Sequence, residues 1–105
     1  MSKIDKNGSS SVLIVDDERQ ILAAVSDILE DDFDILTASS GEEALEIAEE
    51  NHSISVVLAD QRMPKIQGDE LLSRLQVLVP ATRVLMTGYA DLDAVVRAIN
   101  NGKIF

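Results

Sequence analysis

The feature that most constrains the fold of this chain is the regular alternation of two apolar patterns. Short apolar runs, typical of buried strands, alternate with segments in which apolar residues recur at helical spacing. The strand-like runs span residues 11–17, 33–38, 54–60 and 82–88. The helix-like segments span residues 18–31, 40–51, 68–79 and 91–102. Residues 103–105 would begin a fifth strand.

The helical segments carry apolar stripes that we expect to face the core. In the first segment, the stripe consists of Ile21, Leu22, Val25, Ile28 and Leu29. In the third, the inward residues are Leu71, Leu72, Leu75, Leu78 and Val79. The second segment begins with Ser40 and has Glu43 three residues later, the spacing of a capping box.

Strands that are apolar throughout, alternating with amphipathic helices, predict an α/β fold. Its parallel sheet would be covered by helices on both faces, which is a doubly wound arrangement. The chain of 105 residues is long enough for one compact domain and too short for two. We expect a flexible N-terminal lead-in at residues 1–11 and a single domain over residues 12–105.

Charge and composition exclude several classes of function. The formal net charge is −10, and this field repels nucleic-acid phosphates, so we expect no direct nucleic-acid binding. The acidity suits a cation or a basic protein surface, or it simply keeps a small domain soluble.

There is no cysteine for disulfide or thiolate chemistry. No apolar run is long enough to cross a membrane, and the N-terminus does not resemble a secretory signal. We therefore expect a cytoplasmic protein without membrane attachment.

The residues at the carboxyl ends of the predicted strands are the candidates for chemistry, because ligands of open α/β sheets bind there. The first strand ends at Asp16 and Asp17, the third at Asp60, and the fourth at Thr87 and Gly88. Neighbouring strands would bring the three carboxylates together, where they repel one another. Such a cluster is favourable if it holds a hard divalent cation, and Mg²⁺ prefers oxygen ligands.

Each of these features also has a purely structural interpretation. An aspartate at a strand end often caps the following helix, which applies to Asp16, Asp17 and Asp60 taken singly. Thr87 and Gly88 taken alone are typical of a turn. The occurrence of all these residues together, at the ends of three predicted strands, favours a functional site.

Three motifs carry a family resemblance: LIVDDE at 13–18, LADQRMPKIQG at 58–68 and VLMTGYA at 84–90. With this spacing, the chain resembles the receiver domains of two-component response regulators from Val12 to Phe105. The resemblance implies a flavodoxin-like doubly wound sheet of strand order 2-1-3-4-5, a topology exemplified in this same family.

The resemblance also implies a role for each matching residue. Asp60 would be the phosphoacceptor, becoming an aspartyl phosphate. Mg²⁺ would be held by Asp17 directly, by Asp16 mainly through water, by Asp60, and by the main-chain carbonyl of Arg62. Thr87 would contact the phosphoryl group and act as the switch, and Gly88 would donate its main-chain N–H. The change would reach the surface of the fourth strand and fourth helix. Such a module is not an enzyme in the usual sense, since it catalyses at most its own phosphoryl transfer and dephosphorylation.

The C-terminal end departs from the family pattern. Receiver domains usually carry a lysine near the end of strand five, but Lys103 falls at the beginning of the predicted strand and does not match it. Strand five is thus expected to be incomplete and helix five missing. The chain is either a piece of a longer regulator or a naturally short receiver. In both cases an exposed apolar flank would favour self-association.

The leading hypothesis is a phosphoacceptor module that receives its phosphoryl group from a histidine kinase or phosphotransfer protein, with an effector domain beyond Phe105. The alternative is a degenerate receiver that binds partners without phosphorylation. A third class, the Mg²⁺-dependent phosphatases with an aspartyl nucleophile, typically has a second aspartate two residues after the first. Arg62 occupies that position here.

Overall fold

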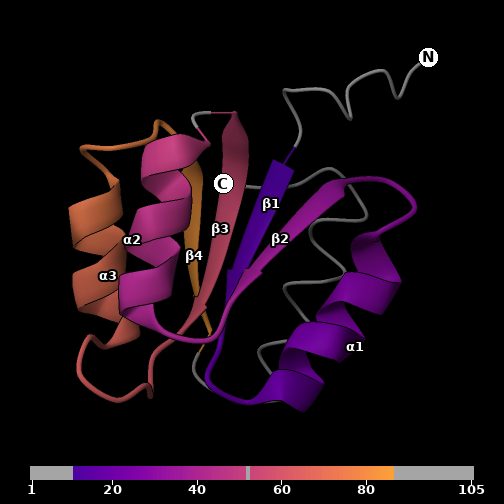
Figure 1. The fold of residues 1–105 in the computed structure, drawn as a ribbon, viewed down its shortest axis with the longest axis horizontal. Coiled ribbons are helices and arrows are strands. Elements are labelled where there is room, and N and C mark those ends of the chain that lie inside the picture. Colours follow the sequence, from indigo (N-terminus) through magenta and orange to yellow (C-terminus); the bar gives the residue numbers. More distant parts are fainter. Residues whose placement is uncertain (1–10, 52, 87–105) are drawn as a thin grey trace.

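The computed structural model describes residues 11–51 and 53–86. Over these residues, strands and helices alternate in the expected order (Figure 1). The strands are β1 (Ser11–Val15), β2 (Asp34–Ala38), β3 (Ile54–Asp60) and β4 (Thr82–Met86). The helices are α1 (Arg19–Leu29), α2 (Gly41–Glu50) and α3 (Gly68–Leu75). No helix of the described residues is both long and apolar enough to cross a membrane.

The described strands form one parallel sheet in the order β2-β1-β3-β4, which confirms the predicted doubly wound α/β fold. β1 lies in the interior of the sheet and pairs with both β2 and β3. The predicted fifth strand at 103–105 and fourth helix at 91–102 fall outside the described residues. The expectations of an incomplete strand five, a missing helix five and self-association therefore stay predictions.

The sheet separates two apolar cores, because side chains of successive strand residues point to opposite faces. In β1, Leu13 and Val15 belong to the core beneath α2 and α3, while Val12 and Ile14 belong to the core beneath α1. Figure 1 shows α2 and α3 side by side on one face and α1 on the other. These four residues of β1 are 0% exposed, which explains why the strand is continuously apolar from Val12 to Val15.

Two predicted helix features need correction. Ile28, predicted to face the core, is 48% exposed because it lies at the margin of the α1 stripe, whereas Val25 and Leu29 are fully buried. The third helix ends at Leu75, not at residue 79. Val79 directly precedes Pro80 and therefore disfavours the helical conformation, but the helix has already ended four residues earlier. Val79 still reaches the core through a turn in which Leu75 O accepts hydrogen bonds from Leu78 N and Val79 N.

The predicted cap of α2 is confirmed in one half and altered in the other. Ser40 Oγ accepts a hydrogen bond from Glu43 N at 3.1 Å, as in a capping box. The Glu43 carboxylate, however, accepts from the N–H and hydroxyl of Ser39, one residue before the expected partner.

Candidate functional site

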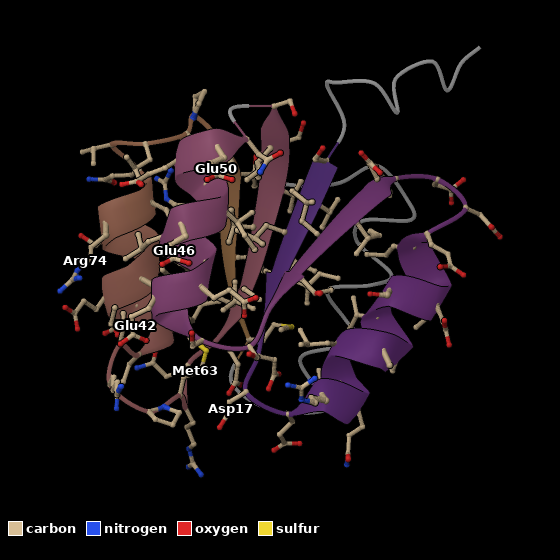
Figure 2. All side chains as sticks on the ribbon, in the orientation of Figure 1. Asp17, Glu42, Glu46, Glu50, Met63 and Arg74 are labelled. Atoms are coloured by element: carbon tan, nitrogen blue, oxygen red, sulfur yellow. The ribbon has the colours of Figure 1, made fainter. Side chains whose placement is uncertain are left out.

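Three aspartates meet at the carboxyl edge of the sheet, as the sequence predicts. Val15 of β1 is paired with Ala59 of β3, so the next residues along each strand, Asp16 and Asp60, are neighbours. One carboxylate oxygen from each of Asp16, Asp17 and Asp60 lies within 4.8 Å of the others. Figure 2 shows Asp17 at this edge, on the loop that leads from β1 into α1. Asp16 is buried, Asp60 half-buried and Asp17 exposed, so the cluster opens to solvent on one side.

Backbone hydrogen bonds hold Asp16 in its position. Its N–H donates to Ala38 O at 3.1 Å, which continues the β1–β2 ladder by one residue. Its Oδ1 accepts a hydrogen bond from Glu18 N at 2.9 Å, just before α1 begins. Asp16 therefore fulfils the structural interpretation and the functional one, since the same side chain orders the start of α1 and joins the acidic cluster.

The cluster is electrostatically unfavourable without a cation. Burial raises the pKa of Asp16 from 3.8 to about 6, against the opposing effect of the hydrogen bond from Glu18 N–H, and the charges of Asp60 and Asp17 raise it further. Burial and the charge of Asp17 also raise the pKa of Asp60, while main-chain N–H groups of Arg62 and Gln61 lower it. A group of ionised carboxylates at this spacing is stabilised by a positive charge among them.

These residues fit a hard divalent cation. All three side chains offer carboxylate oxygens, which are the donors that Mg²⁺ prefers. Asp16 is 5% exposed, so its charge is poorly compensated by solvent alone. The open side at Asp17 leaves space for water ligands, which Mg²⁺ usually retains.

The loop that follows Asp60 is closed by hydrogen bonds around Gln61. Gln61 N donates to Met86 O at 3.0 Å, which continues the β3–β4 ladder, and Gln61 O accepts from Met63 N and Gly68 N, both at 3.2 Å. The Gln61 side chain also contacts the first turn of α3, where Asp69 N donates to Oε1 at 2.9 Å. Gln61 was not among the predicted site residues; the weak capping ability of Gln67, the residue before α3, is the signal that could have revealed it.

Gly68 allows α3 to begin directly against the backbone of Asp60. A β-carbon at Gly68 would lie 2.9 Å from the Asp60 carbonyl carbon and 2.7 Å from Leu85 Cδ1. Real β-carbons do not approach other atoms so closely, so a larger residue would displace either the helix or Asp60. Glycine is needed here for this close approach.

The far side of the loop rests on α2. A β-carbon at Gly41, the first residue of α2, would lie 2.8 Å from Ile66 Cβ. Lys65, beside Ile66, adopts the left-handed conformation with φ 67° and places its ammonium 3.9 Å from Glu42. Figure 2 shows Met63 of this loop close to the α2 end that carries Glu42. The loop is thus packed between α2 and the beginning of α3.

The structure describes only some of the remaining predicted site residues. Arg62, two positions after Asp60, has an exposed side chain. Met86, the last described residue, is paired with Asp60 across β3 and β4. Thr87 and Gly88 follow Met86 in the chain and lie outside the described residues, so their roles stay predictions.

Comparison with known proteins agrees with this geometry. The family model described as response regulator receiver domain matches residues 12–104. The hydrogenase transcriptional regulatory protein HoxA of Cupriavidus necator is 34% identical over 91% of this chain, and the chain spans 20% of that protein. Sporulation initiation phosphotransferase F of Bacillus subtilis is 30% identical over 83% of this chain and 71% of its own length.

A solved structure shows the same architecture. A response regulator receiver domain protein from Clostridium thermocellum has 38% sequence identity and a TM-score of 0.71, with 89% of this chain and 76% of that chain covered. The family match, the sheet order and the acidic cluster lead to one assignment. This chain belongs to the response regulator receiver domain family, and it is a receiver module of two-component signalling.

Proposed function

We propose that this receiver accepts a phosphoryl group on Asp60 in a Mg²⁺-dependent reaction, with a histidine kinase or a phosphotransfer protein as donor. The observation that carries the proposal is the meeting of Asp16, Asp17 and Asp60 at the carboxyl edge of the sheet. Three mutually repelling carboxylates in one partly buried position are unfavourable unless a cation offsets their charge, which favours Mg²⁺-dependent chemistry over an interaction module.

Asp60 has the position expected of the nucleophile. It is the last residue of β3, its main chain is paired with Met86 of β4, and it directly follows Ala59, which is paired with Val15 of β1. In the transfer step, one Asp60 carboxylate oxygen forms a bond to phosphorus while the bond from phosphorus to the donor nitrogen breaks. The electron pair of that bond leaves with the donor imidazole. Reaction of the aspartyl phosphate with water, which releases inorganic phosphate, restores the carboxylate.

Asp17, Asp60 and the main-chain carbonyl of Arg62 would hold Mg²⁺ directly, and Asp16 mainly through water. The bound cation would offset negative charge on the phosphoryl oxygens during transfer. Asp16 and Asp17 thus serve the reaction by making it possible for an ionised Asp60 and an anionic donor to meet.

The signal would leave the site through the fourth strand. Thr87, the residue after Met86, would contact the phosphoryl group through its hydroxyl, and Gly88 through its main-chain N–H. The added phosphoryl charge would bias a pre-existing equilibrium at the surface of the fourth strand and fourth helix. An effector domain beyond Phe105 would read this surface. Location in the cytoplasm, where such donors act, belongs to the same proposal.

A phosphorylation assay tests the proposal. The protein is incubated with a small phosphodonor, with and without Mg²⁺, and its intact mass is recorded. We expect a base-labile phosphoryl mass gain that requires Mg²⁺ and disappears in Asp60→Asn. A protein that binds Mg²⁺ yet never gains the mass would favour the phosphorylation-independent interaction module.

A further inference from the structure

The beginning of α3 receives its cap from a distant residue. Gln67, at the N-cap position, makes no side-chain capping hydrogen bond. The first N–H groups of a helix need acceptors from outside the helix. Here Asp69 N donates to Gln61 Oε1 at 2.9 Å, across eight positions of sequence. The cap of α3 is thus supplied by the residue directly after the proposed phosphoacceptor.

The amide nitrogen of the Gln61 side chain also makes hydrogen bonds. Its Nε2 donates to Gln67 Oε1 and to Asp69 Oδ1, both at 3.3 Å. Asp69 Oδ1 in turn accepts from Glu70 N at 2.8 Å. Glutamine is suited to this position because its side chain is both a donor and an acceptor, which leucine or glutamate is not.

These contacts close the loop 61–67 onto the first turn of α3. The main chain of Gln61 is fixed at the same time to β4 through Met86 O and to Gly68 N. Arg62 lies inside the closed loop, immediately after Gln61, and its carbonyl is the one main-chain ligand in the proposed Mg²⁺ site. The orientation of that peptide is therefore restrained by the hydrogen bonds of its neighbour.

We propose that Gln61 is a positioning residue that holds the Arg62 carbonyl for Mg²⁺ by clamping the β3–α3 loop to the start of α3. This inference rests on the proposed function of Asp60. The Gln61 side chain is engaged with Gln67 and Asp69, so we assign it a positioning role and not the role of a ligand. Replacing a residue that is hydrogen-bonded directly to a metal ligand typically changes metal affinity by roughly 10- to 100-fold. Gln61 acts one step further away, through the main chain of the loop, so we expect an effect at the lower end of that range.

The test compares Gln61→Met with the matched control Gln76→Met, an exposed glutamine at the C-cap of α3. Titration calorimetry with Mg²⁺ alone is expected to show roughly 10-fold weaker binding for Gln61→Met and no change for the control. Amide hydrogen exchange at Asp69, measured without Mg²⁺, should be faster in Gln61→Met. Equal Mg²⁺ affinity of Gln61→Met and the wild type would overturn the inference.

A second pair of variants separates positioning from general stability. Gln61→Glu alone sets two carboxylates against each other at Asp69, so amide hydrogen exchange at position 69 should become faster; Mg²⁺ affinity is not the readout for this variant, because its added charge attracts the cation. Adding Asp69→Asn restores a donor opposite an acceptor at the net charge of the wild type, and both the exchange rate at position 69 and the Mg²⁺ affinity should return close to those of the wild type. This pair decides the matter if Gln61→Met fails to fold, and a double variant no better than Gln61→Glu would contradict the clamp.

Failure of the inference can be distinguished from failure of the proposed function. If the wild type gains a phosphoryl group but Gln61→Met binds Mg²⁺ normally, the inference alone is wrong. If the wild type binds Mg²⁺ but gains no phosphoryl group, the proposed function is wrong, and the Mg²⁺ comparison still decides the role of Gln61.

Discussion

At the scale of single residues, Asp16 combines two requirements that conflict. Its side chain is 5% exposed and accepts the Glu18 N–H, which orders the start of α1. The same carboxylate lies beside Asp60 and Asp17, so its ionised form is disfavoured in the absence of a cation. The site is therefore expected to reduce the stability of the metal-free protein at neutral pH.

We expect Asp16→Asn to stabilise the metal-free protein at neutral pH by about 1 to 2 kcal/mol, a value already reduced for solvent screening. Asparagine keeps the oxygen that accepts the Glu18 N–H but carries no charge. Urea unfolding without Mg²⁺ measures the effect. Asp27→Asn, which removes an exposed charge of α1, is the control and should change the free energy of unfolding little.

The pH dependence of this difference follows from the pKa of Asp16. The folded pKa of about 6 lies above the ordinary 3.8, so the native state holds the proton more tightly than the unfolded chain. Protonation of Asp16 therefore stabilises the native state relative to the unfolded chain. This stabilisation is fully present below about pH 4 and is lost as the pH rises through about 6. Asp16→Asn lacks this dependence. Its advantage over the wild type should be small at about pH 4 and largest near neutrality; an advantage that is independent of pH would contradict the assignment.

At the scale of elements, the contact between α3 and β3 fixes the site. Gly68 lets the first turn of α3 lie against the Asp60 main chain, and Gln61 closes the loop between them. The orientation of Asp60 thus depends on a helix that begins eight residues later.

We expect Gly68→Ala to lower the free energy of unfolding by about 1 to 3 kcal/mol, because a β-carbon there overlaps the Asp60 backbone. In the protein that remains folded, the phosphorylation rate should fall by roughly 10-fold or more, since Asp60 is displaced. Chemical denaturation and the mass assay measure the two effects. Ser73→Ala, at an exposed position of the same helix, should leave both unchanged.

The sequence predicted these elements well where periodicity is strong and less well where tertiary contacts decide. β3 has the predicted bounds because its apolar run ends abruptly at Asp60. The predicted end of α3 at residue 79 was wrong, because the apolar pattern continues through Leu78 and Val79, which reach the core from a turn and not from the helix. The clustering of Asp16 and Asp60 followed from strand ends alone, since adjacent parallel strands share one carboxyl edge. The role of Gln61 could not be predicted, because it depends on a loop conformation that brings residues 61 and 69 together.

At the scale of the whole molecule, the formal charge of −10 makes the three-aspartate site part of a broadly acidic field. Such a field attracts cations in general, so the specificity of Mg²⁺ for the site has to be separated from screening. The dependence of stability on Mg²⁺ concentration separates specific binding from screening, because a ligand that binds only the native state stabilises it according to its affinity.

We expect Mg²⁺ to raise the free energy of unfolding of the wild type by about 1.4 kcal/mol for each tenfold increase in concentration above its dissociation constant. Asp17→Asn should lose most of this dependence while keeping its fold, because Asp17 is exposed. Thermal unfolding at constant ionic strength, maintained with a monovalent salt, makes the comparison. Equal stabilisation of both proteins would mean that Mg²⁺ acts on the overall charge.

In the proposed reaction Asp60 itself receives the phosphoryl group, and peptide mapping tests this most directly. After reaction with a phosphodonor and Mg²⁺, borohydride reduces an aspartyl phosphate to homoserine, and mass spectrometry of the digested protein locates that residue. Homoserine at position 60, dependent on Mg²⁺ and absent when the phosphodonor is omitted, is the predicted result. Homoserine at Asp16 or Asp17, or at no position while the intact protein carries the phosphoryl mass, would contradict it.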